Sequence, residues 1–248
     1  MKRVTSYVVC LALFTSAFVH PASAQSTDYV GGVVNTYLAG RKIITERYGF
    51  TVERDGELSG GAEMTYAEGF TILTGTRASE SRPIHFGANI TNTEILAAQF
   101  NMWPTVYVRV ANQPNREWKT RASVVLETFY WHHYLFLLRQ FERGKSRKQN
   151  FFCLVPGRAR EFELSVELAD TTVYEVADRA IETRHYRIAA PGEPLVELWT
   201  DKQNRPLLIC IEAQQVKAVE EGMETLAEVI LKANAKRLAP KPELRSSP

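Results

Sequence analysis

The sequence predicts a mainly β fold: an antiparallel meander curled into a barrel or half-barrel, with a short buried helix and a C-terminal amphipathic helix. Apolar residues recur at every second position over most of residues 42–215, which is the period of a strand with one buried face. Turn sequences interrupt this pattern at short intervals. Only two later segments, 131–141 and 221–237, break the period. A sheet with one apolar face must cover that face, so it curls up or takes a helix into its concavity.

The first half of the pattern begins at about Ile43. Ile44, Tyr48 and Phe50 share one parity, and the turn sequence Asp55-Gly56 follows them. Residues 25–40 fit a short helix or a strand equally well, and the sequence does not separate the two. Short strands are therefore expected over 43–53, 62–67 and 70–75.

The second half contains the clearest alternation in the chain. Between Glu161 and Leu168 the even-numbered positions are apolar and the odd-numbered ones are acidic or Ser. This pattern is typical of a sheet with one dry and one wet face. The strand pattern continues over 171–176, 180–189, 195–200 and 206–212, with a tight hairpin turn at 201–205.

Two segments have helical character instead. Residues 131–141 are apolar nearly all round and lead into Gly144 and a basic stretch, which predicts a short buried helix. Met223, Leu226 and Ile230 recur at helical spacing, which predicts an amphipathic helix over about 221–237. Both helices are natural candidates to cover the apolar face of the sheet.

Residues 1–24 have the features of a secretory signal peptide. Lys2 and Arg3 precede an apolar run over 7–19, and Ala22-Ser23-Ala24 forms a cleavage site before Gln25. The alternative is a retained anchor helix. These flanking residues disfavour it, and the apolar run is also too short to span a membrane. We therefore expect a periplasmic or secreted protein, with one β-rich domain over 25–238 and a disordered tail over 239–248.

Cleavage after Ala24 leaves 28 basic and 28 acidic residues. This balance does not favour a nucleic-acid partner, because such proteins have a basic surface. No later segment has the apolar length of a transmembrane helix, so none is expected in the mature chain. A basic run from Arg139 to Lys148 suggests peripheral contact with anionic lipid, although a solvated loop is the favoured interpretation.

Two cysteines, Cys153 and Cys210, remain after cleavage. A disulfide between them is one interpretation in an oxidising compartment. The favoured alternative is two buried thiols on different strands, because free cysteine is among the most buried residue types.

No catalytic motif is present, so no catalytic residue, metal ligand or cofactor is predicted and the function leans away from an enzyme. A metal site would require His85 and His185 to meet one of His132 and His133, and the sequence does not show this. Adjacent histidines on a helix point about 100° apart, so the pair cannot chelate from one face.

Aromatic residues crowd the middle third of the chain and give the one candidate for a ligand site. A curled sheet with a helix beside an aromatic-rich concavity is a plausible pocket for an apolar molecule. The residues predicted to line it are Trp103, Trp118, Trp131, Tyr134 and Leu137.

Two stretches carry a family resemblance. The first runs from Glu197 through Leu198-Trp199 and an acidic turn to Leu207, and the second runs from Trp131 to Arg139 with 151–156 after it. They resemble exported bacterial β-rich domains of unknown function, related in shape to the lipoprotein-localisation half-barrels of the Gram-negative periplasm. The resemblance implies a fold, a compartment and a hint of lipid handling, and it implies no catalytic residues.

Three hypotheses follow in order of preference. The first is a non-enzymatic exported protein that binds or scaffolds an apolar ligand such as a lipid or acyl chain. The second is an envelope hydrolase or metal-dependent enzyme with a site assembled from scattered His and Glu residues. The third is an envelope interaction protein with no pocket. A hydrophobic concavity would favour the first hypothesis. Converging histidines would favour the second, and a solid core would favour the third.

Overall fold

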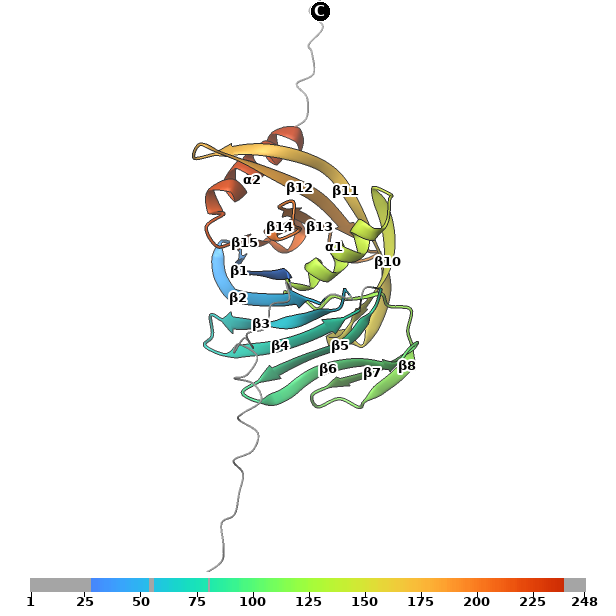
Figure 1. Ribbon diagram of the computed structural model, residues 1–248. Coiled ribbons are helices and arrows are strands. Elements are labelled where there is room, and N and C mark those ends of the chain that lie inside the picture. The colour runs from blue at the N-terminus through green and yellow to red at the C-terminus, as the bar shows by residue number, and fades with distance from the viewer. Residues whose placement is uncertain (1–27, 54–55, 80, 239–248) are drawn as a thin grey trace, which may run out of the picture.

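The computed structural model describes residues 28–53, 56–79 and 81–238, and within them the fold is one 15-stranded sheet curled around a helix (Figure 1). The mainly β class, the curled sheet and the two helices are confirmed. The strand order is β8 to β1 followed by β15 to β9, so the first and last strands pair in the middle of the sheet. Within residues 28–53, 56–79 and 81–238, no helix has the length and apolar character needed to cross a membrane.

The elements follow one another through short turns. The N-terminal strands are β1 (Asp28–Leu38), β2 (Arg41–Val52), β3 (Leu58–Tyr66), β4 (Thr71–Ala78), β5 (Pro83–Ile90), β6 (Thr93–Met102), β7 (Thr105–Val110), β8 (Arg116–Lys119) and β9 (Val124–Val125). The remaining elements are α1 (His133–Arg143), β10 (Lys148–Val155), η2 (Pro156–Arg158), β11 (Arg160–Val176), β12 (Arg179–Ala189), β13 (Val196–Thr200), β14 (Pro206–Ile211), η3 (Glu212–Gln214), β15 (Val216–Glu220) and α2 (Glu224–Leu238).

Several expected boundaries are corrected. The undecided N-terminal segment is a strand, β1, from Asp28 onward. The strands expected over 161–168 and 171–176 are one long strand, β11, whose register shifts between Leu168 and Asp170. A local bulge changes side-chain parity without ending a strand, which is why the pattern looked like two strands. The predicted signal peptide and the disordered tail over 239–248 lie outside the described residues.

The two edges of the sheet, β8 and β9, are consecutive in the chain but do not pair with each other. Residues 120–123 connect them, and β9 pairs with β10. The indole Nε1 of Trp118 donates to Glu161 Oε1 on β11 at 2.9 Å, which ties the β8 edge to the opposite part of the sheet. The sheet is therefore a curled half-barrel rather than a closed barrel.

Helix α1 fills the concavity and α2 covers part of the outer surface. Leu137 and Leu138 of α1 are fully buried against inward-facing residues of the sheet, such as Phe50. On the outer side, Leu226 and Ile230 of α2 pack against Trp199. Strand β14 is thus covered on both faces, which explains why all six of its residues are buried.

A row of directly paired glycines crosses five strands on the outer face, formed by Gly31, Gly49, Gly61, Gly75 and Gly87. The approach is closest at Gly61, where a Cβ atom would overlap the carbonyl oxygen of Thr74 on the next strand. Removing side chains at such positions allows neighbouring backbones to approach and the sheet to bend. At Gly31 and Gly49 the side chain of Tyr29 takes the space that a Cβ atom would occupy.

Cys153 and Cys210 are both buried free thiols. Cys153 belongs to the inner core and Cys210 to the outer cluster under α2, so the two side chains lie on opposite faces of the sheet. The disulfide considered from the sequence is not formed, and the alternative of two buried thiols describes the structure. Burial raises the pKa of the Cys210 thiol to about 12, which keeps it protonated at neutral pH.

We predict that Gly61→Ala lowers the free energy of unfolding by about 1–3 kcal/mol, because its methyl group must displace backbone. The matched control is Gly75→Ala, the partner on the next strand, where a Cβ atom meets nothing within 4 Å. Urea denaturation followed by tryptophan fluorescence measures both. Equal effects of the two substitutions would show that the close approach at Gly61 is not a constraint.

Candidate functional site

The N-terminus of α1 is held by one buried carboxylate. Glu46 on β2 accepts the backbone N–H groups of Trp131 and His132, each at 2.9 Å. The Nδ1 atom of His132 lies 2.6 Å from the same carboxylate, and both side chains are fully buried. An anion at this position is stabilised by the unpaired N–H groups and the positive end of the helix dipole. Glu46 therefore fixes where α1 begins inside the sheet.

Trp131 is fixed by a second buried contact. Its indole Nε1 donates to Thr36 Oγ1 on β1 at 2.7 Å. Phe129 packs edge-on against the indole, and Tyr134 stacks over it. Phe129 itself has φ of 65°, the left-handed region that bulky residues rarely adopt. The contacts around Trp131 thus hold an aromatic group in one orientation at the start of the helix.

His133 is a neutral structural residue. Its Nδ1 accepts the backbone N–H of Glu127 at 2.9 Å, so the ring proton of the neutral form is on Nε2. Burial, and then the neighbouring His132, hold the pKa of His133 well below its usual value. His133 therefore positions the segment that precedes the helix.

A cavity of about 130 Å³ lies between this segment and the inner face of β10–β14. Trp131 and Tyr134 form its helix side, and Phe129 contributes a third aromatic wall. The sheet side is aliphatic and aromatic, formed by Val155, Phe162, Leu164, Ile188, Val196 and Ile211. The residues around it make a mostly apolar chamber beside the start of α1.

Polar residues lie at the rim of this cavity. Arg158 pairs with Glu193 at 3.0 Å, which links η2 to the loop between β12 and β13. Glu127 accepts the backbone N–H of Gly157 at 2.7 Å and that of Thr128 at 3.0 Å. Burial raises the pKa of Glu127, and the two backbone hydrogen bonds oppose that shift. The lining thus combines apolar side chains with a few charged ones, of which Arg158 is half exposed.

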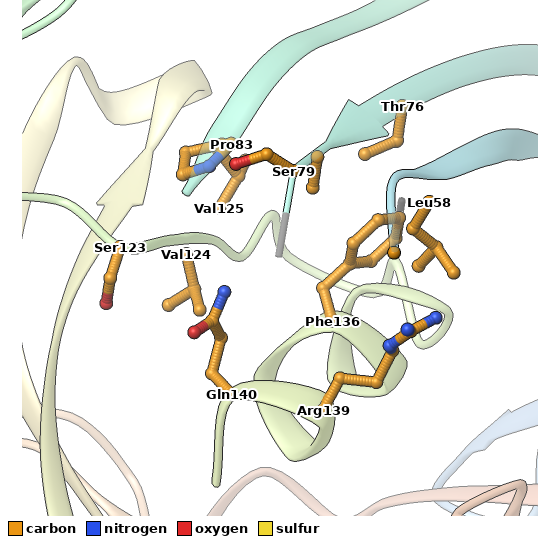
Figure 2. Close-up of a pocket in the computed structure, with 12 residues that line it drawn as sticks. Leu58, Thr76, Ser79, Pro83, Ser123, Val124, Val125, Phe136, Arg139 and Gln140 are labelled. Carbon is orange, nitrogen blue, oxygen red and sulfur yellow. The ribbon is translucent and has the colours of Figure 1, made fainter. Parts of the chain in front are cut away.

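A second, smaller space lies on the other side of α1 (Figure 2). Phe136, Arg139 and Gln140 of the helix point toward it, opposite Leu58 and Thr76 of the sheet. Its volume of about 20 Å³ is room for roughly one water molecule. This space is a packing gap rather than a ligand site.

The structure brings two of the five predicted pocket residues together. Trp131 and Tyr134 line the cavity, whereas Leu137 is fully buried in the core. Trp103 lies at the β6–β7 turn beside Arg82, and Trp118 is held by Glu161 at the sheet edge. The prediction was wrong for these three residues because their closeness in the sequence does not show which elements face the same space.

Residues that the sequence interpretation missed include Phe162, Leu164 and Ile188 on the cavity wall and Glu46 at the helix. The wall residues have the inward parity that the alternation already indicated. Glu46 also had a signal, because it shares the parity of Ile44 and Tyr48 on the apolar face of its strand. A carboxylate at a buried position requires hydrogen-bond donors, and the helix start supplies them.

The histidines do not converge. His85 lies on β5 with the outward parity, opposite to buried Phe86. His185 stacks on Trp199 at 4.2 Å between ring centroids, on the outer side of the sheet, with Asp170 and Glu197 beside it. His132 and His133 are at the start of α1. Across the described ranges, no group of three or more His, Cys, Asp or Glu residues is placed to hold a metal ion.

A second buried polar group lies inside the sheet where β1 meets β15. Tyr48 Oη and Glu220 Oε1 both approach the position that a Cβ atom of Gly32 would occupy, at 2.8 and 2.9 Å. Burial raises the pKa of Glu220 to about 7, Arg205 opposes the shift and Asp201 adds to it. Gly32 therefore provides the space for a carboxyl group that is partly protonated near neutral pH.

Comparisons with known proteins address the fold alone. No protein-family model matches this chain, and no curated protein matches it. One similar solved structure is the beta-barrel-like protein of the domain of unknown function DUF1849 from Brucella abortus, with a TM-score of 0.47 and 7% identity over 80% of this chain and 97% of that one. Another is a DUF1089 family protein from Pseudomonas aeruginosa, with a TM-score of 0.40 and 9% identity over 83% and 95% of the two chains.

These likenesses are distant, and they carry no argument about function. They do not bear on the resemblance to lipoprotein-localisation half-barrels, which stays a prediction.

We predict that Glu46→Ala lowers the free energy of unfolding by about 3–5 kcal/mol, because it leaves buried N–H groups of the helix and His132 without an acceptor. The control is Glu63→Ala, an exposed glutamate on the adjacent strand β3, with an expected change within about 0.5 kcal/mol. Chemical denaturation measures both. A loss below about 1 kcal/mol for Glu46→Ala would show that this carboxylate does not hold the helix.

We also predict a characteristic pH dependence for Glu220→Gln. The folded pKa of Glu220, about 7, exceeds the unfolded value of about 4.3, so this group lowers stability as pH rises through that window. His133 has the opposite effect, because its folded pKa is depressed and stability falls as pH drops below about 6.5. The two groups oppose each other in the wild-type protein.

Removing Glu220 therefore makes stability rise more steeply between about pH 4.5 and 6.5, by up to about 1.4 kcal/mol per pH unit. Denaturation curves at a series of pH values measure this slope. Glu221→Gln, at the exposed neighbouring position, leaves the wild-type slope unchanged. Parallel profiles for Glu220→Gln and the wild type would contradict the raised pKa.

Proposed function

We propose that this protein binds a small apolar group in the cavity beside the start of α1, without catalysing a reaction on it. The observation that carries the proposal is the cavity of about 130 Å³, whose walls are apolar side chains and whose rim is charged. Ligand sites in proteins typically combine an apolar chamber with a few polar groups at defined positions.

The size of the cavity sets the size of the group. An apolar cavity of about 150 Å³ is enough for a benzene molecule, whereas drug-sized ligands occupy about 300 Å³ or more. This chamber therefore suits an aromatic ring or about six carbons of a chain. A longer acyl chain would have to leave most of its length outside. The expected ligand is therefore a short apolar group rather than a whole lipid chain.

The expected affinity is modest. Burying roughly 150–200 Å² of ligand surface contributes about 4–5 kcal/mol at 25 cal/mol per Å². Binding costs reduce this figure, so dissociation constants in the millimolar to high micromolar range are expected. Trp131 lines the cavity and is held by Thr36, so its fluorescence is a direct reporter of occupancy.

The proposed place of action is outside the cytoplasm, in the periplasm or the medium. The support is the N-terminal sequence with its basic start, apolar run and small-residue cleavage site. N-terminal sequencing of the protein purified from its native cells tests this, with a start at or near Gln25 expected. An intact Met1 on the folded protein would rule out export by cleavage.

We predict that Ala190→Phe abolishes ligand binding, because Ala190 lines the cavity and a phenyl ring there occupies the ligand space. The matched control is Ala189→Phe at the adjacent exposed position, which leaves binding unchanged. Trp131 fluorescence is titrated with toluene and hexan-1-ol, and circular dichroism verifies folding. Wild-type protein without any saturable response would instead support a scaffold that has no ligand.

A further inference from the structure

The rim of the cavity contains a cation whose donors are only partly used. Arg158 is half exposed, and its Nη1 donates to the two carboxylate oxygens of Glu193 at 3.0 and 3.3 Å. A guanidinium has five N–H donors. In the part of the chain that the structure describes, the other N–H groups of Arg158 have no acceptor. Arg158 can therefore bind a further acceptor at the entrance.

Both acidic side chains near Arg158 have other partners. Glu193 also pairs with Arg160 at 3.6 Å. Glu127, which feels the charge of Arg158, accepts the backbone N–H groups of Gly157 and Thr128. Neither carboxylate is left alone if Arg158 turns toward a ligand, so the usual cost of an unpaired charge is avoided.

We propose that the ligand is an apolar carboxylate, whose apolar end fills the cavity and whose carboxylate binds Arg158 at the rim. This inference rests on the proposed function and adds the headgroup to it. A planar guanidinium binds a carboxylate through two parallel N–H···O bonds, which fixes the direction of the ligand. The chamber limits the apolar end to about six carbons or one aromatic ring.

The test compares ligands that differ only in the headgroup. Hexanoate, hexan-1-ol and hexylamine are titrated into the purified protein by calorimetry at pH 8 and low ionic strength. We expect hexanoate to bind about five- to tenfold more tightly than hexan-1-ol, a modest factor because Arg158 is partly exposed. Hexylamine, which is cationic at this pH, should bind no more tightly than the alcohol. Added salt should reduce the preference for hexanoate.

Substitution locates the effect. Arg158→Gln should make hexanoate and hexan-1-ol bind with equal affinity, and saturable binding of the alcohol by this variant shows that the cavity is intact. The matched control is Arg77→Gln, because Arg77 is similarly exposed, pairs with Glu57 and does not line the cavity. This control should keep the wild-type preference.

Equal binding of hexanoate and hexan-1-ol by the wild-type protein overturns the carboxylate inference but leaves the proposed function standing. The same conclusion follows if hexylamine binds most tightly, or if Arg158→Gln keeps the preference for hexanoate. Absence of saturable binding for all three ligands overturns both the inference and the proposed function.

Discussion

The position of α1 inside the sheet depends on the buried contact between Glu46 and the start of that helix. A helix surrounded by a curled sheet could slide along its axis, because apolar packing is not directional. Glu46 removes this freedom by accepting two backbone N–H groups and lying against the His132 ring. Removing one partner from such an arrangement is costly, so the contact specifies one register of the helix. Thr36 adds a second fixed point through Trp131.

The cavity is a consequence of where the helix begins. Because α1 begins at His133, the inner face of β10–β14 at the cavity lies opposite the segment 126–131 and Tyr134. That segment is held by His133 through the backbone of Glu127, and Phe129 within it adopts a left-handed conformation. The cavity lies where this irregular segment, rather than a further turn of helix, faces the sheet. The candidate site and the anchoring of the helix are therefore one structural arrangement.

The strands before α1 differ from those after it in what their outer face carries. The row of glycines across β1–β5 leaves the outer face without side chains of its own, and at Gly61 the neighbouring backbone takes the place of a side chain. Strands after α1 carry larger residues and are covered outside by α2. The first half thus allows close approach of neighbouring backbones, whereas the second half is stabilised by burial on both faces.

The sequence by itself determined the mainly β class, the buried helix and the inward parity of residues such as Leu164 and Val166. These features follow from local periodicity, because strands and helices place side chains at fixed angular intervals. Short strands such as β8 and β9 were not recognised, since a few residues cannot show a period. Turn boundaries and the continuity of β11 across its bulge were missed for the same local reason.

Only the tertiary structure decided how distant segments meet. The pairing of β1 with β15 joins residues about as far apart as the domain allows, and no local pattern encodes it. The same holds for the contact between Glu46 and Trp131, 85 residues apart, through which a strand carboxylate holds the segment just before a helix. Trp131 and Tyr134 line the cavity, whereas Trp103 and Trp118 do not. The fold, and not the aromatic content of the sequence, determines which side chains face the same space. Periodicity fixes the face of an element, and long-range packing fixes what lies opposite that face.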